Sequence, residues 1–267
     1  MRLFQKIYAF TLAEVLITIG IVGVIAAITI PSLITKYEKQ KVATKLKLSY
    51  AELGNVIKMA EADYGDSSGW GYTTPDELPQ WVDTYIAPYV KNSGVYDCRN
   101  VNSPCQGING LGVLGYRIHY NNANATRLGY MIKTGINSAA WSFIRDTSAK
   151  SVETKVVVHI NNRNVINAGK YAKQSRNILG RDAFAFVFDT RDLHPTIRPY
   201  EEYASTYAPK LNVSKRDYLL NYVVRNGQCK VGGKQNDNWH TGATCTAVIM
   251  YDGWKINNDY PWQNSFY

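Results

Sequence analysis

The sequence is poor in charged residues, and it has few cysteines and no internal repeat. Charged residues make up 19% of the 267 positions and apolar residues 45%, a balance that allows a packed core and argues against intrinsic disorder. The mean hydropathy of -0.27 excludes a protein built from many membrane spans. Basic residues never occur in a run longer than two, so the net charge of +9 forms no basic tail.

A single long apolar segment lies near the N-terminus, from Phe10 to Ile34. Its last twenty residues, Val15 to Ile34, carry no charge and would form a helix about 30 Å long, enough to cross a bilayer. Arg2 and Lys6 precede the segment, so the positive-inside rule places its N-terminal end in the cytoplasm. Residues 31–36 do not resemble the small-residue cleavage site of a secretory signal, and we expect the segment to be retained.

Glu14 lies inside this apolar segment, near its start. A carboxylate within a membrane span is costly, which makes it a candidate functional residue. The alternative is that Glu14 lies at the cytoplasmic interface and only reaches water.

The residues around Glu14 resemble the processing motif of type IV pilins and type II secretion pseudopilins. In that family a short basic leader is cut off just before a Phe-Thr-Leu-x-Glu sequence, and Ala9-Phe10-Thr11-Leu12-Ala13-Glu14 is similar to this cleavage site. Ala9 stands at the position before the cut, where Gly is usual. The resemblance covers about residues 6–50. It implies cleavage between Ala9 and Phe10, N-methylation of Phe10, and a helix weakened at Gly23 and Pro31 so that it can stretch during assembly.

The resemblance also implies a role for Glu14 in assembly. Cleavage before Phe10 frees an α-amine, and the carboxylate of one subunit can then meet the amine of the next. Such a pair neutralises two charges in apolar surroundings, and losing one partner would cost several kcal/mol. A single buried polar pair also fixes axial register, as it does in a coiled coil.

The implied fold is α+β and pilin-like, with a long N-terminal helix packed on a mainly antiparallel sheet. Its parts are a cleaved leader (1–9), a membrane-spanning or filament-core helix (10–34), an amphipathic helix (35–63) and a head (64–267). The implied protein is a minor pilin or pseudopilin with no enzymatic activity, no cofactor and no metal. Its partners are other pilins, a prepilin peptidase, an inner-membrane platform protein and a motor ATPase. The head is expected in the periplasm, and later in a periplasmic or extracellular filament.

The four cysteines form two pairs that are close in sequence. Cys98 and Cys105 have six residues between them and Cys229 and Cys245 have fifteen, whereas structural zinc sites usually place roughly two to four residues between paired ligands. An even number of cysteines beyond a membrane segment favours disulfides in an oxidising compartment. Loop-closure entropy favours pairing within each close pair, and buried free thiols are the alternative.

The remaining elements are predicted from periodicity and turn residues. Residues 36–63 have the apolar spacing of an amphipathic helix that ends at the breakers 64–69. Residues 75–88 predict a short helix or a pair of turns with an apolar side. Without a βαβ rhythm the strands should form an antiparallel sheet. They are predicted at 116–120, 127–134, 141–145, 155–160, 183–188 and 245–251. Asp252-Gly253 suggests a hairpin turn, the span 95–115 a loop, and residues 189–217 a long surface excursion.

Several alternative functions have weaker support in the sequence. Residues 110–115 form a Gly-rich dinucleotide fingerprint, but a predicted strand follows where a helix is needed. Asp237 with Asn236 and Asn238 could bind calcium, or form a tight polar turn. A head with net charge +6 and the chain's 20 tyrosines could bind nucleic acid or a surface, as in a DNA-uptake or adhesion pilin. For a membrane-tethered periplasmic enzyme we identify no set of catalytic residues.

Overall fold

The structure is a computed structural model that describes residues 10–71, 77–97, 127–134, 140–146, 153–160, 180–190, 195–201, 204–221, 229, 242 and 244–262. The chain divides into two units, residues 1–41 and 42–267, and each is described by itself. Helix α1 (Leu12–Tyr64) contributes to both units. We call Leu12–Lys41 its first half and Val42–Tyr64 its second half.

The first half of α1 begins with an apolar stretch that nothing in the described chain covers. Residues 10–34 are exposed apart from the half-buried Ala26. The most apolar window has a mean hydropathy of 2.4 and contains no buried residue, which distinguishes it from the core helix of a soluble protein. By length and composition this helix could cross a membrane, as the sequence predicts.

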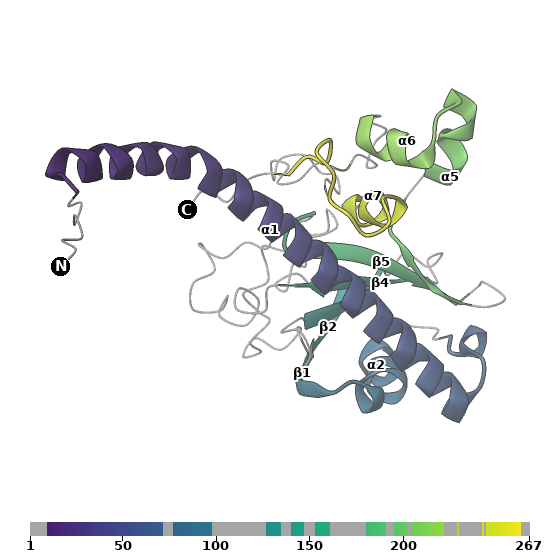
Figure 1. The fold of residues 1–267 in the computed structure, drawn as a ribbon. Coiled ribbons are helices and arrows are strands. Elements are labelled where there is room, and N and C mark those ends of the chain that lie inside the picture. Colours follow the sequence, from purple (N-terminus) through teal and green to yellow (C-terminus); the bar gives the residue numbers. More distant parts are fainter. Residues whose placement is uncertain are drawn as a thin grey trace, which may run out of the picture. The chain divides into compact units, whose positions relative to one another are not determined.

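The second half of α1 packs on a sheet, as the apolar spacing predicts. Its buried apolar residues lie on one side of the helix, and they are Ala43, Leu46, Leu53, Val56, Ile57 and Ala60. Tyr50 stacks on Phe186 with ring centroids 5.6 Å apart, and its hydroxyl donates to the Ile197 carbonyl at 3.2 Å. Figure 1 shows this half of α1 lying across the sheet.

The sheet is a six-stranded antiparallel meander in which each strand pairs with the next one along the chain. Its strands are β1 (Asn92–Asp97), β2 (Arg127–Thr134), β3 (Ala140–Asp146), β4 (Glu153–His159), β5 (Ala183–Asp189) and β6 (Ile197–Pro199). The predicted strands at 127–134, 141–145, 155–160 and 183–188 are therefore confirmed. The structure agrees with the α+β class, and all five pairs of neighbouring strands are antiparallel.

The two faces of the sheet differ in chemistry. Alternating residues place Phe184, Phe186 and Phe188 on the face that packs in the core with α1. The register puts His159 opposite Ala140 and Ala183 on the other face, where small and polar side chains predominate. Both faces are buried at residues 140–143, 154–159 and 183–189 of β3, β4 and β5.

The predicted strand at 245–251 is wrong, because these residues form helix α7 (Cys245–Tyr251). All residues from Cys245 to Ile249 are buried, so the segment has no exposed face whose period would have revealed a helix. The predicted hairpin turn at Asp252-Gly253 is also wrong, because these residues end helix α7. Gly253 has φ +67, and the amides of Gly253 and Trp254 donate to the carbonyls of Met250 (3.0 Å) and Ile249 (2.8 Å), which is a Schellman stop of a helix.

Two predicted loops also contain regular structure. Strand β1 (Asn92–Asp97) includes the first three residues of the predicted 95–115 loop. The predicted excursion at 189–217 holds strand β6, helix α5 (Ala204–Tyr207), the turn η5 (Pro209–Leu211) and the start of helix α6 (Lys215–Asn221). These pieces are too short to show a period in the sequence.

The short elements after α1 follow the prediction more closely. Helix α1 ends at Tyr64, where Gly65 takes φ +80, and the turn η1 (Ser67–Gly69) follows. Helix α2 (Leu78–Tyr85) and the turn η3 (Ala87–Tyr89) lie where a short helix or a pair of turns is predicted at 75–88. Trp81, Val82 and Ile86 are buried, as predicted for its apolar side. The predicted strand 116–120 and residues 110–115 lie outside the described residues.

Candidate functional site

The start of α1 is closed by a reciprocal set of hydrogen bonds between Thr11 and Glu14. The Thr11 amide and hydroxyl both donate to Glu14 Oε2 at 2.8 Å, and the Glu14 amide donates to Thr11 Oγ1 at 3.2 Å. This is a capping box, in which the side chains satisfy backbone amides that the helix leaves without partners. The Thr-x-x-Glu spacing before an apolar run could have predicted it.

The capping box gives Glu14 a local role that the sequence analysis missed. It fixes the carboxylate on the amide of Thr11, the residue after Phe10, which is itself 86% exposed. Within the described chain, Glu14 Oε1 has no hydrogen-bond partner, because both bonds to the carboxylate use Oε2. One oxygen therefore remains for a group from outside the described residues. Ala9, on the other side of the predicted cleavage site, lies outside them.

The predicted helix-weakening residues lie in an unbroken helix. Gly23 and Pro31 both fall within α1, and a Cβ added at Gly23 would meet nothing within 4 Å. Proline lacks an amide, so the Ala27 carbonyl loses the donor that an ordinary residue at position 31 would supply. The two residues lower helix stability by about 1 and 3 kcal/mol relative to alanine, although the helix persists through both.

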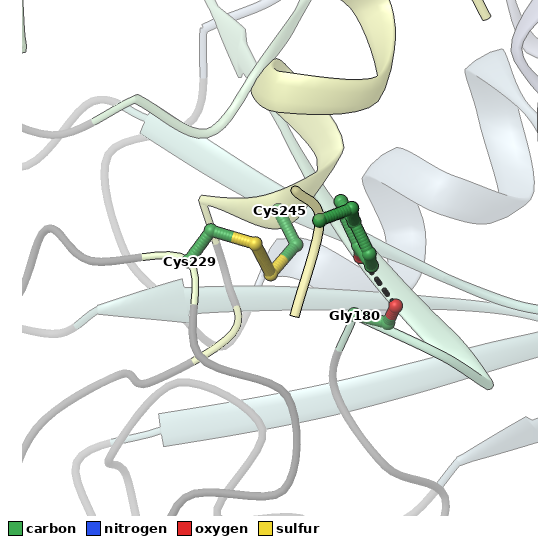
Figure 2. The surroundings of a disulfide bond; sticks show 4 residues. Gly180, Cys229 and Cys245 are labelled. Atoms are coloured by element: carbon green, nitrogen blue, oxygen red, sulfur yellow. Dashed lines mark hydrogen bonds between the residues drawn. A yellow bond between two sulfur atoms is a disulfide. The ribbon is translucent and has the colours of Figure 1, made fainter. Parts of the chain in front are cut away.

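One of the two predicted disulfides is present in the described chain. Cys229 is bonded to Cys245, the first residue of α7, and both are buried. The Cys229 amide also donates to the Leu219 carbonyl in α6 at 2.7 Å. Figure 2 shows the disulfide beside Gly180, whose carbonyl accepts a hydrogen bond from the Tyr260 hydroxyl. The disulfide fastens the start of α7 to Cys229, which is in turn hydrogen-bonded to α6. Cys98 and Cys105 lie outside the described residues.

A serine and a histidine form a buried pair on the second face of the sheet. Ser142 Oγ lies 2.9 Å from His159 Nε2, and the two residues are 7% and 0% exposed. Burial lowers the pKa of His159 to about 4, so the imidazole is neutral at pH 7. A substrate could reach neither side chain without displacing the residues that cover them.

One catalytic pattern escaped the sequence analysis, which found no catalytic residues. Residues 65–69, Gly-Asp-Ser-Ser-Gly, match the Gly-x-Ser-x-Gly pattern of serine hydrolases, which requires a sharp turn between a strand and a helix. Here the segment follows the end of α1 and forms η1. Ser67 is fully buried, and its hydroxyl donates to Glu61 Oε1 at 2.6 Å. This serine therefore holds the turn against α1.

The described part of the chain also offers no metal site. Within the described ranges, no group of three or more His, Cys, Asp or Glu side chains could hold a metal ion. Asp237 with Asn236 and Asn238, the calcium candidate, lies outside these ranges.

The sequence profile of DUF6613, a family of unknown function, matches residues 32–111 and 116–263. The chain belongs to this family. The DUF6613 match begins at Ser32, so the exposed apolar stretch and the Phe10–Glu14 motif lie in front of it. No curated protein and no solved structure matches the chain.

Proposed function

We propose that this chain is a subunit of a pilin-like filament, either a minor pilin or a pseudopilin of a secretion system. Before assembly, the first half of α1 holds it in the inner membrane with the head in the periplasm. The observation that carries the proposal is a long uncovered apolar helix that starts with a fixed carboxylate and continues into a packed head.

The exposed apolar stretch supports an apolar environment for residues 10–34. Side chains such as Ile17, Val22 and Ile28 are 62%, 63% and 72% exposed, and each would gain about 1.5–3 kcal/mol on full burial. A bilayer buries them before assembly, and the helices of neighbouring subunits bury them in a filament. The same helix serves in both environments because it satisfies its own backbone hydrogen bonds.

The position of Glu14 supports assembly in register. In the membrane, the capping box supplies two donors to Oε2 and lowers the cost of placing a carboxylate at the edge of the apolar layer. In the filament, Glu14 Oε1 accepts a hydrogen bond from the α-amine of Phe10 in the next subunit. Only one axial position brings the two charges together, and a filament in any other register leaves both unpaired.

The processing steps and partners follow from the pilin resemblance. A prepilin peptidase cleaves between Ala9 and Phe10 and methylates the new amine, and a platform protein and motor ATPase extract the subunit. The predicted head of about 200 residues is large for a major subunit, which favours a minor or tip-proximal position.

Mass spectrometry of the mature N-terminus tests the processing step. We expect the native protein to begin with N-methylated Phe10. A mature chain that retains Met1, or that is cut after Ile34, would contradict the proposal.

Substitution of Glu14 tests the assembly step. Glu14→Ala should remain in the membrane fraction at the wild-type level and be absent from sheared filaments, because the registry pair is lost. Glu38→Ala removes a carboxylate from the same helix outside the motif and should assemble normally. Equal incorporation of both variants would show that Glu14 only caps its own helix.

A further inference from the structure

Helix α1 begins just beyond the proposed cleavage site. Its first helical residue is Leu12, so Phe10 and Thr11 lie before the helix, and both are exposed. The Thr11 carbonyl accepts the first backbone hydrogen bond of the helix, from the Val15 amide at 3.3 Å. This bond and the capping box identify Thr11 as the N-cap residue. The backbone on the C-terminal side of the scissile bond is therefore outside the helix.

The sequence before Thr11 contains no other residue that would stop a helix. Residues 1–10 include no Gly and no Pro, and they also lack Ser, Thr, Asp and Asn, the usual N-cap residues. Ala9, directly before the scissile bond, has the highest helix propensity of all residues. The Gly that is usual at this position in pilins would disfavour a helix by a factor of roughly five relative to Ala. The start of α1 at Leu12 thus depends on the capping box.

The conformation around the scissile bond matters for its hydrolysis. The bond between the Ala9 carbonyl carbon and the Phe10 nitrogen breaks, and water supplies a hydroxyl group to the new carboxyl of Ala9 and a proton to the new amine of Phe10. A peptidase must reach this bond, and exposed segments outside regular structure are the preferred sites of cleavage. In a helix, the carbonyl and amide groups around the bond are used for helical hydrogen bonds and must first be released.

The hydrogen bonds of Thr11 oppose an earlier start of α1. In a longer helix the Thr11 amide would donate to the carbonyl four residues before it, so its bond to Glu14 Oε2 would be lost. The bond from the Glu14 amide to Thr11 Oγ1 would also be replaced by a helical bond. The capping box therefore favours the helix that starts at Leu12 by a factor of about five.

We propose that Thr11 is a positioning residue for the prepilin peptidase, because as the N-cap of α1 it keeps the Ala9–Phe10 bond out of the helix. This inference rests on the processing step of the proposed function. The cap presents the bond before cleavage, and Glu14 Oε1 serves assembly after it. Loss of the cap lowers the fraction of chains that can be cleaved. That change raises KM by the same factor and leaves kcat unchanged.

Cleavage of the full-length chain by a prepilin peptidase in detergent micelles tests this role. Mass spectrometry of the N-terminus gives the initial rates. Thr11→Val removes the hydroxyl but keeps the shape and the low helix propensity of threonine, and KM should rise by a factor of about two to five. Thr18→Val is the matched control. It removes a hydroxyl that donates to the Val15 carbonyl within the same helix at 2.9 Å, and it should be cleaved like wild type.

Two further substitutions separate the cap from a direct contact between Thr11 and the peptidase. Serine and asparagine are strong N-cap residues, so Thr11→Ser and Thr11→Asn should both keep the wild-type KM. Asparagine differs from threonine in shape, so it would not restore a direct contact. Ala9→Gly disfavours the longer helix independently. In a chain that carries this substitution, Thr11→Val should therefore raise KM by less than about twofold.

The inference is wrong if Thr11→Val is cleaved like wild type, or if kcat falls while KM stays the same. It is also wrong if Thr11→Asn is impaired as much as Thr11→Val, which would assign Thr11 to a direct contact. Failure of the proposed function gives a different result, because wild type itself would then not be cleaved between Ala9 and Phe10.

Discussion

The two halves of α1 belong to one continuous helix but place their apolar side chains in opposite ways. Between Leu12 and Ile34 the apolar residues occur all around the helix, and all but Ala26 are exposed. Between Val42 and Ala60 they recur every three or four residues and are buried against the sheet. Within α1, the half whose apolar residues follow a helical period packs in the core, and the half that is apolar all round does not.

The two halves of α1 differ in the contacts that stabilise them. The second half is stabilised by contacts within the chain, such as the stacking of Tyr50 on Phe186. The apolar stretch of the first half has no such contacts within the described chain, and under the proposed function a bilayer or neighbouring subunits supply them. Substitutions in the two halves should consequently affect different measurements.

The largest effect is expected for the buried stripe. Leu53 is fully buried, and Leu53→Ala should lower the free energy of unfolding by about 2–5 kcal/mol because a cavity remains in the core. Ile25→Ala removes a similar side chain that is 56% exposed and should leave the value unchanged. Urea unfolding of the full-length protein in mild detergent, followed by tryptophan fluorescence, measures both. An equal loss of unfolding free energy in the two variants would contradict the difference between the two halves of α1.

The disulfide should have the next largest effect, and only on the head. Replacing Cys229 and Cys245 with serine opens a loop of 16 residues in sequence separation and should cost about 3 kcal/mol. The same urea titration measures the loss. Resistance to alkaline carbonate should not change, since the apolar stretch lies elsewhere in the sequence. A double variant as stable as wild type would mean that α7 is held by its packing alone.

Much of the second half of α1 and of the sheet was predictable because each has one face of distinct chemistry. The residues Leu46, Leu53 and Ala60 have helical spacing, and β5 alternates phenylalanine with smaller residues. Helix α7 was not predictable in this way. It is buried from Cys245 to Ile249 and rich in β-branched residues, so packing overrides its local preference for a strand.

The candidate site was predictable only in part. Thr11 and Glu14 belong to the pilin-like motif and also form a capping box. The motif was predicted from the sequence and the capping box was not. Asp252-Gly253 occurs at hairpin turns and at helix ends alike, because both require a residue with positive φ. Only the tertiary structure distinguishes the two uses.

A smaller effect, dependent on pH, is expected on the second face of the sheet. The pKa of His159 is lowered from 6.5 to about 4 by burial, so below pH 6.5 the unfolded chain binds a proton that the folded chain does not. Stability should therefore fall as the pH falls, by about 2 kcal/mol between pH 6.5 and 5 at 1.36 kcal/mol per pH unit. Burial raises the pKa of Glu52. This shift has the opposite effect on stability, because it favours the folded chain as the pH falls.

Comparison with His159→Gln isolates the histidine contribution. Urea titrations of wild type and variant from pH 7 to 5 should show a steeper loss for wild type, whatever the variant costs at pH 7. Parallel pH profiles would mean that His159 is protonated in the folded chain.

The smallest effect compares the N-terminal caps of two helices. Ser214 and Asp217 at the start of α6 form two of the hydrogen bonds that also occur in the cap of α1: Ser214 Oγ donates to Asp217 Oδ2 at 2.7 Å, and the Asp217 amide donates to Ser214 Oγ at 3.0 Å. Removing either cap should cost its helix about 1 kcal/mol. Ser214→Ala should therefore lower the free energy of unfolding of the head by that amount.

Thr11→Ala should leave the stability of the head unchanged and instead speed hydrogen exchange at the Glu14 amide about fivefold, since this amide loses its acceptor. Exchange measured by NMR in detergent micelles, with the Leu53 amide as an internal reference, resolves the change. If Thr11→Ala also destabilised the head, the start of α1 would be coupled to the core, and the two halves of the helix could not be treated as separately stabilised. An unchanged exchange rate would mean that the cap does not hold Glu14, whose carboxylate would then reach a partner without being fixed beforehand.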